Sequence, residues 1–566
     1  TGIDVTGSVV SDGMSTNTAG TSNFVAGVNA GNSIVSGGNY NTVVGDNAGT
    51  AITTGDENVA LGYNSLLSNT TGTLNTATGA FSLRYNTTGA NNTGLGYLAL
   101  GANTTGGSNV AVGKNSLAAN TTGTANVGVG VGVLDANTTA SYNTGLGHEA
   151  LSTNTTGANN TAVGALALNA NTTGSYNTAL GNEALKTVTT VNDLTAVGYT
   201  ALRDNTSGTS NTAVGKASLR VNTTGADNTG VGILSLGSNT TGASNTAVGS
   251  SALNANTTGS NHTAVGYNAL SSNTTANDNT AIGNSALLAN TTGWGNTAVG
   301  VASLDANTTG TKNITIGGYS LTTNTTGASN VAVGYNSLGA NTTASNNTAV
   351  GDSALGANTT GSYNAAFGDN VLLSNTIGTH NHGVGRFALK LNTSGTYNDA
   401  MGYAALENNT TASYNVAIGG TALRANTTGA NNTAVGYSSL LANTTGANNT
   451  AVGTSALDAN TTGAGNTAVG GTALSLNTTA ANNTAMGHSA LKVNTTGHSN
   501  AALGKNALND NTTASYNTAV GTYSMDKTTT GSSNTAVGYQ SLEQNTTGHS
   551  NLAAGYHALK ANTTAT

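Results

Sequence analysis

Residues Asn449 to Gly465 read Asn-Thr-Ala-Val-Gly-Thr-Ser-Ala-Leu-Asp-Ala-Asn-Thr-Thr-Gly-Ala-Gly, and Asn466 begins the same pattern again. The glycine that closes Asn-Thr-Ala-Val-Gly recurs every 17 residues from Gly45 to Gly555, which marks 31 repeats without an insertion or deletion. A fixed repeat of this kind indicates units that bury their apolar side chains only by stacking on their neighbours. We therefore expect an all-β fold, a β-solenoid (parallel β-helix or β-roll) of about 31 coils with a 17-residue period.

The composition excludes several classes of protein. The 566 residues include no Cys and no Pro, charged residues make up 6%, and the formal net charge is −7. Without clustered Lys and Arg, we expect neither nucleic acid nor an anionic membrane surface as a partner. No apolar run is long enough to cross a bilayer, so no membrane span is expected. Because the chain starts at Thr1 and stops inside a repeat, we interpret it as a piece of a longer protein, and no signal peptide is recognised.

The repeat divides the chain into two parts. Residues 1–22 lie outside the register and are interpreted as a lead-in or cap, with short strands expected around Ile3, Val5, Val9 and Val10. Residues 23–566 are expected to form one continuous solenoid array. Two lapses keep the repeat length: residues 188–191 replace Asn-Thr-Thr-Gly by Val-Thr-Thr-Val, and Thr528 stands at another Asn position.

Within one coil, we place a short strand on Asn-Thr-Ala-Val, a turn at Gly, an apolar corner at Ala-Leu and a third turn at Asn-Thr-Thr-Gly. Side chains alternate along a strand, so Thr and Val share one face and Ala takes the other. We expect the Val and Leu positions to form two hydrophobic stacks. Because this core is thin, hydrogen bonds between coils and ladders of stacked Asn must contribute. The corner Asn is also expected to adopt the left-handed conformation.

The Ala of Asn-Thr-Ala-Val is held to small residues, Ala in most coils and Gly in others. On the interpretation above it points away from the Val face, and an exposed surface has no reason to forbid bulk. We therefore predict that this strip packs against another chain. The candidate inter-chain residues are Ala162, Ala213, Ala247 and Ala298.

These motifs resemble known fibres. The unit Asn-Thr-Ala-Val-Gly-x-x-Ala-Leu-x-x-Asn-Thr-Thr-Gly is similar to the repeats of bacteriophage tail-fibre proteins and of large bacterial surface proteins over residues 23–566. Its strand and glycine resemble, more distantly, the Asn-Ser-Val-Ala-Ile-Gly repeats of YadA-type trimeric autotransporter adhesin heads. The resemblance implies an extracellular β-solenoid fibre, commonly trimeric, in a virion tail or on a cell surface.

The function expected from this resemblance is structural. The chain would be the shaft of a phage tail fibre or an adhesin stalk that projects a receptor-binding tip. Its partners would be copies of itself, in a homotrimer or an end-to-end fibre, and a host-surface receptor, with glycans among the candidates, contacted through regions outside this chain. The alternative is a binding surface along the solenoid itself.

The sequence offers no enzyme site, so no catalytic, cofactor-binding or metal residues are assigned and no cofactor is expected. Gly-x-Gly at Gly94 and Gly96 lacks the strand, turn and helix of a dinucleotide site. Carboxylates are scattered over variable positions, so no acid and base pair stands out. His380 and His382 could share a strand face, but no third metal ligand accompanies them.

Three surface features keep the binding alternative open. Tyrosines gather beside the strand and could bind sugar rings or another chain; the candidate aromatic rim is Tyr63, Tyr97, Tyr267, Tyr335 and Tyr403. The Asn-Thr-Thr turn is an N-glycosylation sequon as well as a ladder position; its representatives are Asn69, Asn86, Asn103 and Asn460. Ranks of Thr suggest an ice-binding face, although adjacent Thr residues leave only one outward rank.

Overall fold

The structure is a computed structural model that describes residues 14–15 and 18–565. The described chain is a parallel β-solenoid of about 31 turns with a 17-residue period and without helices, which confirms the fold class expected from the repeat. The strands expected between Ile3 and Val10 lie outside the described residues. Two compact units are present, residues 1–279 and 280–566.

Each coil contributes one strand of three residues, except at the beginning of the chain. In unit 1 the strands are β1 (Met14–Ser15), β2 (Phe24–Ala26), β3 (Thr42–Val44), β4 (Val59–Leu61), β5 (Thr76–Thr78), β6 (Thr93–Leu95), β7 (Val110–Val112), β8 (Val127–Val129), β9 (Thr144–Leu146), β10 (Thr161–Val163), β11 (Thr178–Leu180), β12 (Thr195–Val197), β13 (Thr212–Val214), β14 (Thr229–Val231), β15 (Thr246–Val248) and β16 (Thr263–Val265).

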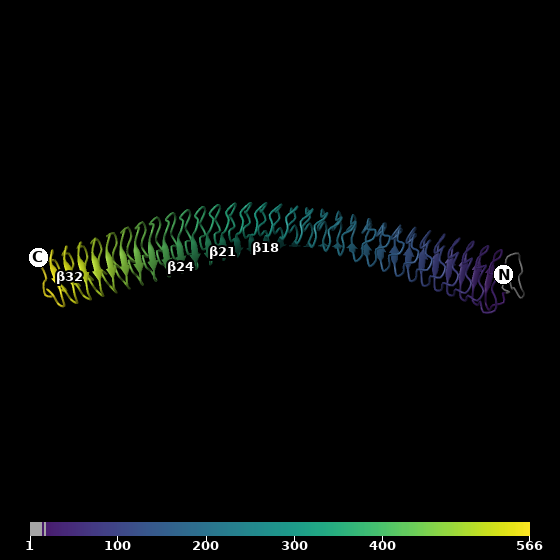
Figure 1. Cartoon of the computed structure of the whole chain (residues 1–566), viewed down its shortest axis with the longest axis horizontal. Coiled ribbons are helices and arrows are strands. Elements are labelled where there is room, and N and C mark those ends of the chain that lie inside the picture. The colour runs from purple at the N-terminus through teal and green to yellow at the C-terminus, as the bar shows by residue number, and fades with distance from the viewer. Residues whose placement is uncertain (1–13, 16–17, 566) are drawn as a thin grey trace, which may run out of the picture. The chain divides into compact units, whose positions relative to one another are not determined.

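The strands of unit 2 are β17 (Thr280–Ile282), β18 (Thr297–Val299), β19 (Ile314–Ile316), β20 (Val331–Val333), β21 (Thr348–Val350), β22 (Ala365–Phe367), β23 (His382–Val384), β24 (Asp399–Met401), β25 (Val416–Ile418), β26 (Thr433–Val435), β27 (Thr450–Val452), β28 (Thr467–Val469), β29 (Thr484–Met486), β30 (Ala501–Leu503), β31 (Thr518–Val520), β32 (Thr535–Val537) and β33 (Leu552–Ala554). Figure 1 labels β18, β21, β24 and β32 in this stack.

Equivalent residues of successive coils lie side by side. Thr450, Ala451 and Val452 of β27 pair in parallel with Thr467, Ala468 and Val469 of β28. The turns stack in the same way, since the backbone N–H of Leu457 donates to the carbonyl oxygen of Ala473 at 3.0 Å. The hydrogen bonds between coils that the thin core requires are therefore present throughout each unit.

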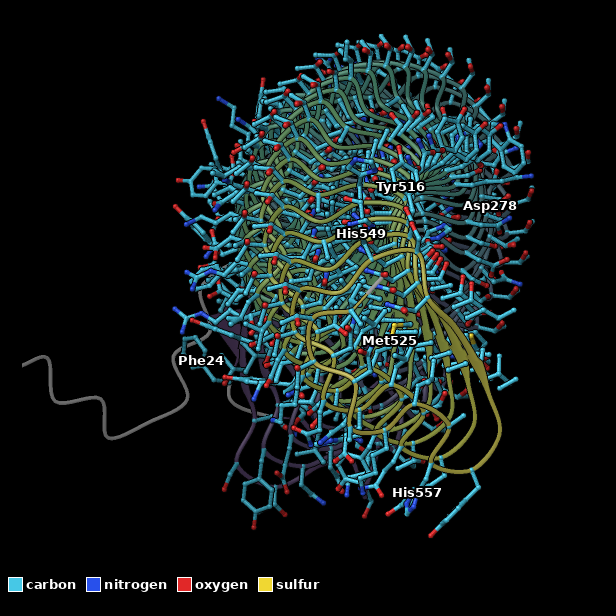
Figure 2. All side chains as sticks on the ribbon, turned by 90° about the vertical axis from the view of Figure 1, so that its left-hand side faces the viewer. Phe24, Asp278, Tyr516, Met525, His549 and His557 are labelled. Carbon is cyan, nitrogen blue, oxygen red and sulfur yellow. The ribbon has the colours of Figure 1, made fainter. Side chains whose placement is uncertain are left out.

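The interior of the coil differs from the expectation in one respect. Leu457 is fully buried, as predicted, and Met525, which replaces Leu in its coil, is also fully buried (Figure 2). However, the buried residue of each three-residue strand is the middle one, usually Ala, while the flanking residues, usually Thr and Val, point outward; Val452 is 37% exposed. The prediction that the Val stack forms the core is wrong. Leu, Ala and Asn fill the interior instead.

The left-handed backbone also falls elsewhere than expected. The corner asparagines Asn69, Asn86 and Asn103 are absent from the residues with positive φ, so the prediction for them is wrong. The buried Leu adopts this conformation instead, with φ 54° at Leu457, and so do the second residue after the glycine and the residue before the strand-start Asn. Each such non-glycine residue costs about 1–2 kcal/mol, so stacking must hold these turns in place.

The glycine after each strand is required by both conformation and space. Gly453 has a φ of 134°, and a Cβ atom there would lie 2.6 Å from the carbonyl oxygen of Gly470 in the next coil. Because the same close approach recurs in coil after coil, a side chain at this position would separate neighbouring coils. This explains why the glycine marks every repeat.

Candidate functional site

The middle strand residues line the interior of the coil and are not available to another chain. Ala162, Ala213, Ala247 and Ala298 are all fully buried. The prediction that this strip forms an inter-chain surface is therefore wrong. Alternation correctly separates the Ala face of the strand from the Thr and Val face, but the Ala face points inward and not outward.

The reason for the small residue is shared interior space. A Cβ atom on Gly94 would lie 2.5 Å from the Ser82 Oγ atom, and one on Gly145 would lie 2.5 Å from a methyl group of Val133. In both cases the residue 12 positions earlier projects into the same space, and Ser82 donates from its hydroxyl to the Gly94 carbonyl oxygen at 2.9 Å. A large residue such as Val133 is therefore compensated by glycine within the same coil.

The corner asparagines form a buried ladder. Asn86 donates from Nδ2 to Asn69 Oδ1 at 2.8 Å and to the carbonyl oxygen of Gly89 at 2.9 Å. Asn103 repeats this arrangement on Asn86, and Asn460 repeats it on Asn443. All are fully buried. Since both hydrogens of each Nδ2 group are used inside the protein, attachment of a glycan there would require this part of the ladder to open.

A second ladder runs beside the first from the strand-start asparagines. Asn75 accepts on its Oδ1 atom from the backbone N–H of Asn92 at 3.0 Å, and its Nδ2 group donates to the Gly89 carbonyl oxygen at 2.9 Å. Because Gly89 also accepts from Asn86, one carbonyl joins the two ladders. The coil interior is thus closed by continuous polar rows rather than by apolar contact alone.

The two lapses in the repeat interrupt the corner ladder. Val188 and Leu194 are fully buried and form an apolar patch where two Asn would stand. The Oδ1 atoms of Asn171 and Asn511, which precede Val188 and Thr528 by one coil, are buried without a hydrogen-bond partner. The lapses therefore preserve the backbone but leave acceptors unpaired.

His262 replaces a strand-start Asn and titrates in an unusual environment. Its Nε2 atom lies 2.6 Å from the carbonyl oxygen of Ala276, and the backbone N–H of Asn279 donates to its Nδ1 atom at 3.2 Å. This pairing requires the neutral ring, with its proton on Nε2. Burial lowers the pKa of His262 below the ordinary value of 6.5, against a smaller opposing effect of the two backbone hydrogen bonds.

We expect the coil around His262 to lose stability in acid. Below about pH 6.5 the unfolded chain takes up a proton that the folded ring resists, so stability falls as the pH decreases from 6.5 to the lowered folded pKa. The slope should approach about 1.4 kcal/mol per pH unit. Hydrogen exchange of the amides near residues 262–279, measured at several pH values and converted to free energies of opening, gives this slope. His262→Asn, which restores the repeat residue, should flatten the profile; an unchanged slope in this variant would contradict the assignment.

The candidate aromatic rim lies on the surface. Tyr63, Tyr97, Tyr267, Tyr335 and Tyr403 are 49%, 46%, 57%, 61% and 54% exposed. Several pack edge-on against aromatic rings of neighbouring coils; the ring centroids of Tyr63 and Phe81 lie 5.4 Å apart, and those of Phe81 and Tyr97 lie 5.8 Å apart. The rim therefore consists of short clusters of rings rather than of one continuous row.

A separate aromatic stack lies in unit 2, at the residue before the strand-start Asn. The rings of Tyr363, His380, Tyr397 and Tyr414 follow one another face to face, with centroids 4.9, 4.7 and 5.3 Å apart. Since the faces of the inner rings are covered by their neighbours, sugar rings could stack only at the two ends.

The two histidines considered as metal ligands have different partners. His380 belongs to the aromatic stack, whereas the Nδ1 atom of His382 lies 2.7 Å from Asp399 Oδ1. Among the described residues, no group of three or more His, Asp or Glu side chains is placed to hold a metal ion.

Charged side chains elsewhere pair between successive coils. Arg424 Nε lies 2.7 Å from Glu407 Oε2, and Lys527 Nζ lies 2.9 Å from Asp510 Oδ2. These partly exposed pairs add little stability. They neutralise carboxylates that would otherwise be candidates for acid and base chemistry.

The Asn-Thr-Thr turn presents one outward row of threonine. Thr70 donates from its hydroxyl to the carbonyl oxygen of Thr87 at 3.1 Å, whereas Thr71 is exposed. The strands present a second row of Thr, but beside it lies a row that varies from Val452 to Phe367 in size. Because the side chains of this row differ in size, the surface is uneven and does not favour a match to the flat lattice of ice.

Together, these features define a β-solenoid repeat protein whose interior is closed by Asn, Leu and Ala and whose sheet carries an outer face with His382 and Asp399 as its ionisable residues in the described strands. No protein-family model matches the chain, and no curated protein is similar to it in sequence. In the part of the chain that the structure describes, no helix is long and apolar enough to cross a membrane.

Proposed function

We propose that this chain is the shaft of an extracellular fibre, a phage tail fibre or a bacterial adhesin stalk, and that its copies associate along the outer face of the sheet. This outer sheet face consists of the first and third residues of each strand. The observation that carries the proposal is the chemistry of this face: Thr occupies most first positions, and Val, Leu, Ile or Met occupies most third positions, over coil after coil in each unit. Exposed apolar surface of this extent marks an interaction site.

A second copy is the partner that fits this face best. Another chain of the same kind has the same 17-residue period, so every coil can make an equivalent contact. A three-residue strand covers about 10 Å by 4.8 Å, so the strands of unit 2 offer on the order of 800 Å², which is what each partner contributes to a standard interface. A charged partner would find little to bind. The resemblance to trimeric adhesin heads favours three copies.

The solution mass of the native particle tests this proposal. Light scattering should give the mass of several chains, with three expected. In the variant Val435→Lys/Val452→Lys/Val469→Lys, buried charges at the interface should dissociate the particle into single chains with an unchanged circular dichroism spectrum. A wild-type particle with the mass of one chain would contradict association and would favour free binding surfaces.

A matched control places the same charges in the same coils but off the outer sheet face. Tyr437→Lys/Thr454→Lys/Gly471→Lys uses the position after the glycine, where Lys already occurs at Lys114, Lys216 and Lys505. This variant should keep the wild-type mass. Dissociation of both variants would indicate a general effect of charge rather than an interface on the sheet.

A further inference from the structure

The outer sheet face is interrupted chemically at one place in unit 2. Among the described strands from β2 to β33, the ionisable residues on this face are His382 of β23 and Asp399 of β24. They lie in adjacent coils at the position usually held by Thr, with their Nδ1 and Oδ1 atoms 2.7 Å apart. Both side chains are more than half exposed. This contact uses one polar atom of each side chain, and His382 Nε2 and Asp399 Oδ2 remain as further hydrogen-bonding atoms.

The relief of the face also changes beside this pair. The residues that line a hollow of about 320 Å³ include His382, Asp399, Met401 and Ile418. Met401 is 54% exposed, the largest exposed fraction among the bulky apolar residues at the third strand position. The face therefore carries a protruding, flexible side chain next to a depression.

A uniform repeat face has a register problem. If two copies pack along identical coils, a slip by one coil replaces each contact by an equivalent one and loses only the contact at the end. Uniform surfaces specify register weakly, and a single buried polar group is a well-attested way to fix it. A slipped arrangement would bury these further atoms of His382 and Asp399 against rows of Thr and Val.

We propose that His382, Asp399 and Met401 form a registration site that fixes the axial register between copies of this chain. This inference rests on the proposed self-association. In the correct register the hydrogen-bonded His382 and Asp399 pairs of two copies lie near each other, and the protruding Met401 side chain of one copy enters a hollow of the other. In any slipped register these groups meet the regular repeat and lose both contacts.

The absence of cysteine allows a direct measurement of register. Thr462→Cys introduces one exposed thiol on the Asn-Thr-Thr-Gly turn, away from the outer sheet face. With a nitroxide attached, double electron–electron resonance measures distances between copies in the assembled particle. The variant His382→Thr/Asp399→Thr/Met401→Val converts β23 and β24 to the common Thr-x-Val pattern and should fold normally.

We expect a narrow set of distances in the Thr462→Cys background alone. In the registration-site variant, the distribution should broaden into components that correspond to slips of about 4.8 Å per coil, while the particle mass stays unchanged. A matched control, Met486→Val, removes the other methionine of the third-position row and should leave the distances narrow.

The outcomes separate this inference from the function on which it rests. A single-chain mass for the wild type removes the proposed association itself. An unchanged mass with equally narrow distances in the registration-site variant overturns the registration site alone. Loss of association in that variant, with an intact circular dichroism spectrum, also overturns it, because the three residues would then supply adhesion rather than register.

Discussion

Replacing Asn460 by Asp is expected to destabilise the solenoid around its coil by about 3–5 kcal/mol at neutral pH, which is the usual cost of leaving an uncompensated charge buried. Asn460 donates from Nδ2 to Asn443 Oδ1 at 2.8 Å and to the Gly463 carbonyl oxygen at 3.0 Å. A carboxylate is nearly the same size but has no hydrogens there. It would place a fully buried negative charge against two acceptors.

The sign of the pH dependence follows from the same geometry. Burial among acceptors would raise the pKa of the new carboxyl above its ordinary value, so the variant should recover stability as the pH falls and the carboxyl becomes a donor. Hydrogen exchange at residues 443–477 measures both effects. Destabilisation that does not depend on pH would contradict the explanation by a buried charge.

Asn448→Asp is the matched control for this substitution. Asn448 is exposed and precedes the strand-start Asn. The same position carries Asp naturally at Asp193, Asp227 and Asp278, all with positive φ. We expect a change within about 0.5 kcal/mol, which is usual for surface substitutions. Comparison of the two variants therefore shows whether the loss of stability comes from burying the charge or from adding a charge anywhere in the coil.

The sequence was sufficient to predict the period, the parallel stacking, the buried Leu and the importance of Asn ladders, because each follows from identity repeated at a fixed spacing. It was not sufficient to decide which side of the strand faces inward. Alternation defines two faces, and the larger apolar residue, Val, was assigned to the interior. The corner Leu and the Asn rows occupy most of that interior, so the residue beside them is Ala or Gly in most coils, with Val43 and Thr315 among the exceptions.

Two further features of the sequence indicate which strand residues face inward and where the outer face is interrupted. Glycine replaces the middle Ala at Gly145, where the residue 12 positions earlier is the larger Val133. Such compensation indicates a shared interior. Likewise, His382 and Asp399 become conspicuous only when the first strand residues of all coils are compared as one row, and their hydrogen bond required the parallel register of β23 and β24.

The substitution Ala298→Leu tests the direction of the strand most directly. Ala298 is fully buried and pairs with Ala281 on one side and Thr315 on the other. Overfilling a packed interior usually costs 1–3 kcal/mol; here the added atoms lie between stacked coils, so we expect about 3 kcal/mol or more. Coils next to β18 should lose hydrogen-exchange protection, and this loss should appear in separated chains as well as in assembled particles.

The adjacent residue provides the control that makes this result decisive. Val299→Leu adds one methylene group to an outward side chain, at a position where Leu occurs naturally in Leu95, Leu146 and Leu180. The change should leave protection unchanged, because the added atoms extend into solvent or toward a partner. If Ala298→Leu instead left single chains intact and only prevented their association, the Ala strip would be an interface after all. Loss of protection with Leu at residue 298, together with unchanged protection with Leu at residue 299, would place the interior on the Ala side of the strand. The Thr and Val side would then remain available to other copies of the chain.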